Sequence, residues 1–446
     1  MVPLHENRRQ YGRRGVVSTG DAAQRARRSR RGSSDTGGPG EAVSGPRLVS
    51  LPVVVAALAA ALLLGFLIIR YSVANALLQA GPELAAAVSP GHPRVILGHA
   101  LEELQLSGRI TPASAAAAFG AFRRSPLSEV PLLIAGRSAM AAGEEERAER
   151  LIEAAIRRNP RSRYGLLLRL EQEVRLGKVA EAAETMAVLT RASPNVGPLL
   201  TLQLAGLARD PSTRTAAQNA MRSDPELRRR VLEQLARQGA DPEVILSLAG
   251  GLDPVPAGAE PPQWQRLLID GMVERGEVAE AHRVWLRLMR IDPAAARGGI
   301  YDRDFAGLPG SPPFNWLLET GSNGFAEPSD GGLQVQFDAR ADARLASQLL
   351  VLPPGDYRLS FTAEGEASGE NGRLSWTVAC QPGGRPIVVA EIVGVDGSEK
   401  PFRGTFTVPP SRCPGQWLRL VGEDAEFPDD QQVTIRQLRI EGGGLR

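Results

Sequence analysis

The chain has 446 residues, 43% apolar and 23% charged, so it is long enough for several domains and too apolar to be disordered throughout. Its net charge of +2 is uneven: residues 1–47 hold ten arginines and four acidic residues, a charge of +6, leaving −4 for the rest. Because the basic excess is confined to this tail, we expect no nucleic-acid partner. Two cysteines and four histidines exclude a disulfide-rich scaffold and a four-cysteine zinc site.

Residues 1–47 form an arginine-rich tail in which the arginines alternate with Gly, Ser, Pro and Asp. Such a segment cannot bury enough apolar surface to offset its conformational entropy, so we predict that it is disordered. Two roles fit the arginines: they orient a membrane protein during insertion, or they contact anionic lipid headgroups.

The segment from Leu48 to Ile69 is apolar, with no charge in 22 residues. As a helix it would extend roughly 33 Å, close to the thickness of a hydrocarbon core of about 30 Å. We therefore predict a single transmembrane helix over residues 48–70. The alternative is a cleaved signal peptide ending near Ala76, but both the apolar run and the charged leader are longer than signal peptides have.

The arginine excess on the N-terminal side predicts a cytoplasmic N-terminus. Everything from a linker at residues 71–93 onward would then lie across the membrane. The composition, rich in Ala, Arg and Gly and poor in Lys, suggests a bacterial protein. We accordingly predict a single-pass inner-membrane protein with a periplasmic C-terminus.

Residues 94–296 repeat one spacing of glycine, alanine and proline, in which the alanine follows the glycine by five positions and the proline by seventeen. The three sets are Gly143, Ala148 and Pro160; Gly177, Ala182 and Pro194; and Gly276, Ala281 and Pro293. Gly143 and Gly177 lie 34 residues apart, a period typical of helix-turn-helix repeats. At these residues the sequence resembles the tetratricopeptide repeat family, which implies an all-α solenoid.

Between residues 198 and 260 the repeat pattern is degenerate. Asp-Pro pairs such as Asp224-Pro225 and Asp241-Pro242 suggest irregular helix stops. The whole helical region, 94–296, would hold four to six helical pairs. Solenoids of this kind present concave surfaces to protein partners, so the resemblance implies a docking scaffold. The alternative is a spacer that holds the C-terminal domain away from the membrane.

In residues 301–442 the sequence pattern changes to short alternating apolar segments separated by Gly, Pro, Asp and Asn. Eight segments predict strands, which fits an antiparallel β-sandwich. They are 332–337, 343–352, 355–363, 372–380, 387–395, 402–408, 416–421 and 432–441. The stretch QLLVLPPGDYRLSFTAEGE, from Gln348 to Glu366, resembles carbohydrate-binding modules with the galactose-binding jelly-roll fold. This resemblance rests on core and turn residues, so it implies the fold more directly than sugar binding.

Carbohydrate-binding surfaces need exposed aromatic side chains. Strand alternation places Trp376 with Leu374 and Val378, which predicts a core residue. Trp417 alternates with leucines and shares the opposite face with Arg419, so it is the first candidate for a glycan contact. Trp316 is the second: it packs at the junction with the repeats or forms part of a binding lip.

Cys380 and Cys413 both lie in the domain that we expect in an oxidising compartment. A disulfide between them is the simpler interpretation, and two buried free thiols are the alternative.

No residue set predicts catalysis. The sequence has no GxSxG, HExxH or phosphate-binding loop, and its histidines are isolated. A calcium site among the acids of residues 424–430 is a minor alternative, because acids in turn-rich segments are usually solvated. We therefore predict no enzyme activity, no cofactor and no metal.

The leading functional prediction is a non-enzymatic, membrane-anchored periplasmic scaffold for protein-protein interactions, in an architecture that resembles accessory proteins of envelope or exopolysaccharide assembly. The alternative is a membrane-tethered carbohydrate-binding protein that uses the C-terminal sandwich.

Overall fold

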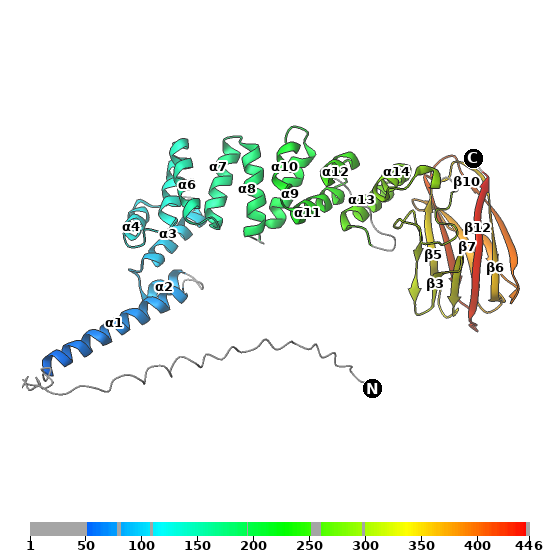
Figure 1. Ribbon diagram of the computed structural model, residues 1–446, viewed down its shortest axis with the longest axis horizontal. Helices are drawn as coiled ribbons and strands as arrows, with labels where there is room; N and C mark the ends of the chain where they lie inside the picture. The colour runs from blue at the N-terminus through cyan, green and yellow to red at the C-terminus, as the bar shows by residue number, and fades with distance from the viewer. Residues whose placement is uncertain are drawn as a thin grey trace, which may run out of the picture. The chain divides into compact units, whose positions relative to one another are not determined.

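The structure, a computed structural model, describes residues 51–77, 82–107, 110–193, 195–250, 260–296 and 299–442 (Figure 1). The predicted disordered tail lies outside these residues. The chain divides into two compact units, Met1–Ile69 and Arg70–Arg446.

Helix α1 (Leu51–Leu77) contains most of the predicted membrane span. Its large apolar side chains are exposed, from 75% for Leu62 to 39% for Leu67. Among the residues that the structure describes, no helix combines the length and apolarity needed to cross a membrane. The transmembrane prediction for residues 48–70 is therefore not supported. The expected linker, 71–93, is partly helical, since it holds the end of α1 and all of α2 (Pro82–Val88).

Beyond α2 the chain continues as helices that pack on their neighbours in sequence. Their bounds are α3 (Pro93–Ser107), α4 (Pro112–Phe122), α5 (Val130–Ala141), α6 (Glu145–Arg158), α7 (Arg163–Arg175), α8 (Val179–Ala192), α9 (Gly197–Arg209), α10 (Arg214–Met221), α11 (Pro225–Arg237), α12 (Pro242–Ala249), α13 (Gln263–Glu274) and α14 (Val278–Met289), followed by the 3₁₀ helix η1 (Pro293–Ala296). The predicted helical region is confirmed, while its membership of the tetratricopeptide family stays a prediction.

The repeat glycines end the first helix of a pair with a left-handed residue. Gly143, Gly177 and Gly276 have φ angles of 74°, 69° and 80°. In each turn the residue after the glycine donates its backbone N–H to the carbonyl five residues earlier, as in Glu144 to Ala139 at 2.9 Å. This Schellman geometry satisfies carbonyls that the helix end leaves open. Gly239, which the spacing did not single out, forms the same turn between α11 and α12, with φ 62°.

The other repeat residues occupy packing and turn positions. The alanines are buried, with exposed fractions of 0, 3 and 0%; they are Ala148, Ala182 and Ala281. Pro160 lies in the turn after α6, and Pro293 begins η1. Pro194 lies outside the described residues.

The Asp-Pro pairs in the degenerate stretch correct the sequence interpretation. The Asp224 carboxylate caps α11 by accepting from the Leu227 N–H at 2.9 Å, and Asp241 caps α12 by accepting from the Glu243 N–H at 2.8 Å. A proline at the first helical position lacks an N–H that would be unpaired there in any case. These two pairs therefore begin helices rather than stop them.

The C-terminal region is an antiparallel β-sandwich of two sheets. The five-stranded sheet has the order β1-β5-β11-β7-β8, and the larger sheet runs β10-β6-β12-β4-β3-β2, with β9 paired to β6. The bounds are β1 (Leu317–Leu318), β2 (Thr320–Gly321), β3 (Gly324–Ser329), β4 (Gly332–Phe337), β5 (Ala343–Leu350), β6 (Gly355–Ala367), β7 (Arg373–Gln381), β8 (Ile387–Ile392), β9 (Val395–Asp396), β10 (Lys400–Val408), β11 (Gly415–Glu423) and β12 (Gln431–Gly442). The predicted order, helices followed by a sandwich, is confirmed.

Two strand predictions differ from the structure. The segment 387–395 is two strands, separated at Gly394, where φ is 67°. The strands β1 to β3 were not predicted. Two of them have only two residues, and β3 carries a glycine and a proline that weaken its strand pattern.

An aromatic cluster joins α14 to the sandwich. Trp285 is fully buried, with ring centroids 5.3 Å from Tyr301 and 5.7 Å from Phe314. Its indole N–H donates to the Ser311 carbonyl at 2.9 Å. From β5, the Gln348 side chain accepts from the Tyr301 N–H at 3.2 Å and donates to the Tyr301 carbonyl at 2.8 Å. The last helices and β5 therefore share one apolar core.

Candidate functional site

The outer face of the five-stranded sheet carries polar side chains from three neighbouring strands. On β11, Leu418 and Leu420 point into the core, so Trp417 and Arg419 point outward. Arg419 lies opposite Thr377 of β7 and Ser347 of β5. Strand alternation had placed Trp417 and Arg419 together on this face.

The two side chains contact one another. The Arg419 guanidinium carbon lies 5.1 Å from the centroid of the Trp417 ring, a cation-π arrangement worth about 0.5 to 1 kcal/mol when exposed. The Trp417 indole N–H donates to Gln381 Oε1 at 3.2 Å. Trp417 is half-buried, because it also packs against the apolar core shared with the last helices. Its position is therefore held from two sides.

Two hydrogen-bonding atoms on this face have no partner. They are Arg419 Nε and Ser375 Oγ, both shielded from solvent. Ser375 and Thr377 are only 2% and 6% exposed although they belong to the outer face. A buried polar atom without a partner costs about 1 to 3 kcal/mol, so a ligand that hydrogen-bonds to these atoms would recover free energy.

Arg419 differs from the neighbouring arginines of this face in its ion pairing. Among the described residues, no carboxylate lies within 4.0 Å of its guanidinium, whereas Arg344 pairs with Glu319, and Arg373 lies 4.0 Å from Glu391. Burial lowers the pKa of Arg419, and the positive charge of Arg344 lowers it further. Arginine stays protonated even so. The face therefore presents an uncompensated positive charge.

Trp316, the second candidate for a glycan contact, lies inside the sandwich. It is 9% exposed, its ring packs against Phe305 and Trp376, and its indole N–H donates to the Asp302 carbonyl at 3.0 Å. The alternative of a binding lip is therefore wrong for this residue. Trp376 is fully buried, as the alternation predicted.

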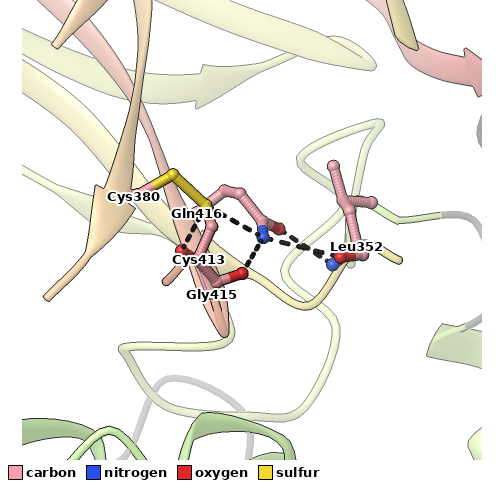
Figure 2. The surroundings of a disulfide bond; sticks show 5 residues. All are labelled: Leu352, Cys380, Cys413, Gly415 and Gln416. Atoms are coloured by element: carbon pink, nitrogen blue, oxygen red, sulfur yellow. Dashed lines mark hydrogen bonds between the residues drawn. A yellow bond between two sulfur atoms is a disulfide. The ribbon is translucent and has the colours of Figure 1, made fainter. Parts of the chain in front are cut away.

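A disulfide fixes the start of β11 close to Trp417. Cys380 and Cys413, the two cysteines expected to pair, are bonded to each other across 33 positions of sequence. Figure 2 shows the Gln416 side chain between the disulfide loop and Leu352. It donates to the Cys413 carbonyl at 3.0 Å and accepts from the Leu352 N–H at 2.8 Å. These contacts attach the loop before β11 to the ends of β5 and β7.

The acids at 424–430 do not form a recognisable metal site. Across the described ranges, no group of three His, Cys, Asp or Glu side chains is arranged to hold a metal ion. The Asp424 N–H donates to Asp342 Oδ1 at 3.1 Å, a contact between two loops that are distant in sequence.

By structure, the sandwich resembles carbohydrate-binding modules. No family profile matches the chain, and no curated protein matches its sequence. One similar solved structure is the CBM22-1 xylan-binding domain of Paenibacillus barcinonensis Xyn10C, at 17% identity over 29% of this chain and 85% of that domain, with a TM-score of 0.22. A CBM4 structure matches at 14% identity over 32% and 99%, with a TM-score of 0.24. TmCBM61, solved with β-1,4-galactotriose, matches at 16% identity over 33% and 95%, with a TM-score of 0.22.

Proposed function

We propose that the outer face of the five-stranded sheet binds a saccharide. One observation carries the proposal: Trp417 and Arg419 lie side by side on an outward strand face. Ser375, two positions along β7 from the Thr377 that pairs with Arg419, adds an unpartnered hydroxyl in the described structure. Saccharides present apolar C–H patches and many hydroxyl groups, which match an amphipathic aromatic ring beside a multi-donor guanidinium.

In this proposal each side chain has its own role. Arg419 covers one side of the Trp417 ring, so a sugar ring that stacks there displaces the guanidinium, which then donates to the sugar's oxygen atoms. The hydrogen bond from Trp417 to Gln381 keeps the indole in place during this exchange. Because Arg419 has no carboxylate partner in the described structure, a sugar bearing a carboxylate or sulfate should bind more tightly than a neutral one.

A glycan array with the purified full chain tests this proposal. Wild type should bind a subset of the saccharides, with acidic members among the strongest, and Trp417→Ala and Arg419→Gln should lose that binding. Phe427→Ala is the matched control, since Phe427 is 74% exposed and lies outside the strands of this face. A wild-type chain that binds no glycan on the array contradicts the proposal.

A second function, docking of a protein partner on the helical region, is favoured by two hollows between its helices. One lies among α6, α7 and α8, and the other among α8, α9 and α11. The helical region would then be the scaffold, and the sandwich would bring it to a saccharide surface such as the cell envelope or an exopolysaccharide.

We also propose that the chain is attached to a bacterial inner membrane through α1, with its tail in the cytoplasm and its folded part in the periplasm. The support is the exposed apolar surface of α1, the arginine excess before it, and a disulfide of the kind that persists in oxidising compartments. Resistance to alkaline carbonate extraction, with reporter fusions at both ends, tests this. A cytoplasmic C-terminus would contradict it.

A further inference from the structure

The hollow among α6, α7 and α8 is rich in acidic side chains over an apolar floor. Its acids come from all three helices: Glu149 and Glu153 from α6, Glu173 from α7 and Glu181 from α8. Ile152 and Leu176 supply apolar surface, the first fully buried and the second 39% exposed.

The cations around this hollow are already engaged. Lys178 pairs with Glu149 at 2.9 Å, which raises the lysine's pKa, and Arg169 pairs with Glu173 Oε1 at 2.7 Å. Glu181 has no ion pair with any cation in the described part of the chain within 4.0 Å. The hollow therefore keeps negative charge that its own cations do not compensate.

Glu173 supplies an independent observation. Only 6% of this residue is exposed, and its Oε2 atom, shielded from solvent, accepts no hydrogen bond. A carboxylate oxygen shielded in this way costs free energy unless a donor reaches it. Arg169 contacts only the other oxygen, and Glu173 is one of the residues that line the hollow, so its carboxylate has capacity for one more donor.

The chemistry of the lining selects the donor. A metal ion is disfavoured, because no cluster of three metal-ligating side chains occurs in the ranges that the structure describes. An arginine side chain fits: its aliphatic stem can lie on Leu176 and Ile152, and its fork of N–H donors can reach a carboxylate. We propose that this hollow receives an arginine from a basic segment of a partner protein. The inference rests on the proposed docking role of the helices and names its partner's chemistry.

Binding of a six-arginine peptide to the full chain, measured by calorimetry at low salt, tests the proposal. Wild type should bind the peptide, while a six-glutamine peptide of equal length should not bind. Glu173→Gln keeps the shape of the side chain and removes its charge, and Glu181→Gln does the same at the exposed rim. Glu173→Gln should weaken binding about tenfold, because it removes one partner of a desolvated charge pair. Glu181→Gln should weaken it by about twofold to fivefold, because an exposed pair contributes less.

Glu184→Gln is the matched control, because Glu184 is exposed on α8 but does not line the hollow; its binding should equal wild type. If Glu173→Gln lowers the melting temperature, its weaker binding could come from a folding defect. The exposed variant Glu181→Gln then tests the proposal by itself. Peptide binding that survives both substitutions, or no binding at all, overturns the proposal. If the chain binds a six-glutamate peptide but not the six-arginine peptide, the helices dock a partner, but the partner's residue is not arginine. The saccharide proposal does not depend on any of these peptide results.

Discussion

His282 is an enclosed titratable side chain in the junction between α14 and the sandwich. Its ring lies 5.8 Å from Trp285 and 4.9 Å from Phe314, and burial lowers its pKa below the ordinary 6.5. The junction therefore forms around a neutral imidazole. As the pH falls, His282 is therefore protonated in the unfolded chain at a higher pH than in the folded chain.

The stability of the junction should therefore depend on pH. Well above pH 6.5 the His282 imidazole is neutral in both the folded and the unfolded chain. As the pH falls below that value, the unfolded chain binds the proton first, so the stability of the junction decreases. We expect the melting temperature, followed by tryptophan fluorescence, to fall between pH 7.5 and 5.5. His282→Phe keeps the ring and should flatten this slope. His92, whose pKa is also lowered, is present in both proteins, so equal slopes would contradict the assignment.

The residues of the saccharide face were only partly predictable. Alternation of apolar residues along β11 assigns Trp417 and Arg419 to one face without knowledge of the neighbouring strands. That Arg419 lacks a carboxylate partner depends on which strands lie beside β11 and in which register, and no local pattern contains that information. For Trp316, packing was one of the two interpretations that the sequence allowed. The partner was not predictable: the ring packs inside the sandwich, against Trp376.

At the scale of the element, the turns of the helical region depend on glycine conformation. An alanine at Gly143 would adopt φ 74°, a left-handed conformation that costs an L-residue about 1 to 2 kcal/mol, although no atom obstructs its Cβ. Gly206, in the interior of α9, is also unobstructed, but its φ is not left-handed.

Alanine substitutions at the two glycines should therefore change the free energy of unfolding in opposite directions. Gly143→Ala should lower the free energy of unfolding by about 1 kcal/mol, and Gly206→Ala should raise it by roughly 0.5 to 1 kcal/mol, because alanine restricts the unfolded chain. Urea unfolding followed by circular dichroism at 222 nm measures both. Destabilisation of equal size by the two substitutions would show that backbone conformation is not the cause.

Helix pairs were predictable where glycine and a small residue recur at fixed spacing. The turn at Gly239 has the same backbone, but valine occupies the fifth position after it, so the pattern did not identify it. The Asp-Pro pairs misled for a physical reason: proline is compatible with the first turn of a helix as well as with its termination. The capping hydrogen bonds of Asp224 and Asp241 decide between these, and they exist only in the folded chain.

The disulfide is the main covalent constraint on the site strand. Cross-linking residues 33 apart stabilises a domain by roughly 3 to 4 kcal/mol on the loop-entropy estimate. We expect the double substitution Cys380→Ala, Cys413→Ala to shift the urea midpoint of the sandwich to lower concentration by a corresponding amount. With reductant, the urea midpoint of the wild type should equal that of the double variant. If reductant also shifts the midpoint of the double variant, the shift does not come from the disulfide.

At the scale of the whole molecule, the change in texture near residue 299 separates helices from strands, and this order was predictable. The shared core between them was not, because it is formed by side chains of α14, the 299–316 segment and β5 that are distant in sequence. Trp417 packs against this core, so the last helices help to position the face for which saccharide binding is proposed.

The most direct test of the central proposal is calorimetric titration of the array's strongest saccharide into the full chain and its variants. We expect affinity to fall at least about tenfold in Trp417→Ala and in Arg419→Gln, with Phe427→Ala unchanged. The loss of affinity caused by Arg419→Gln should be smaller for a neutral analogue than for an acidic sugar. Saccharide binding of wild-type affinity in both Trp417→Ala and Arg419→Gln would show that this face is not the binding site.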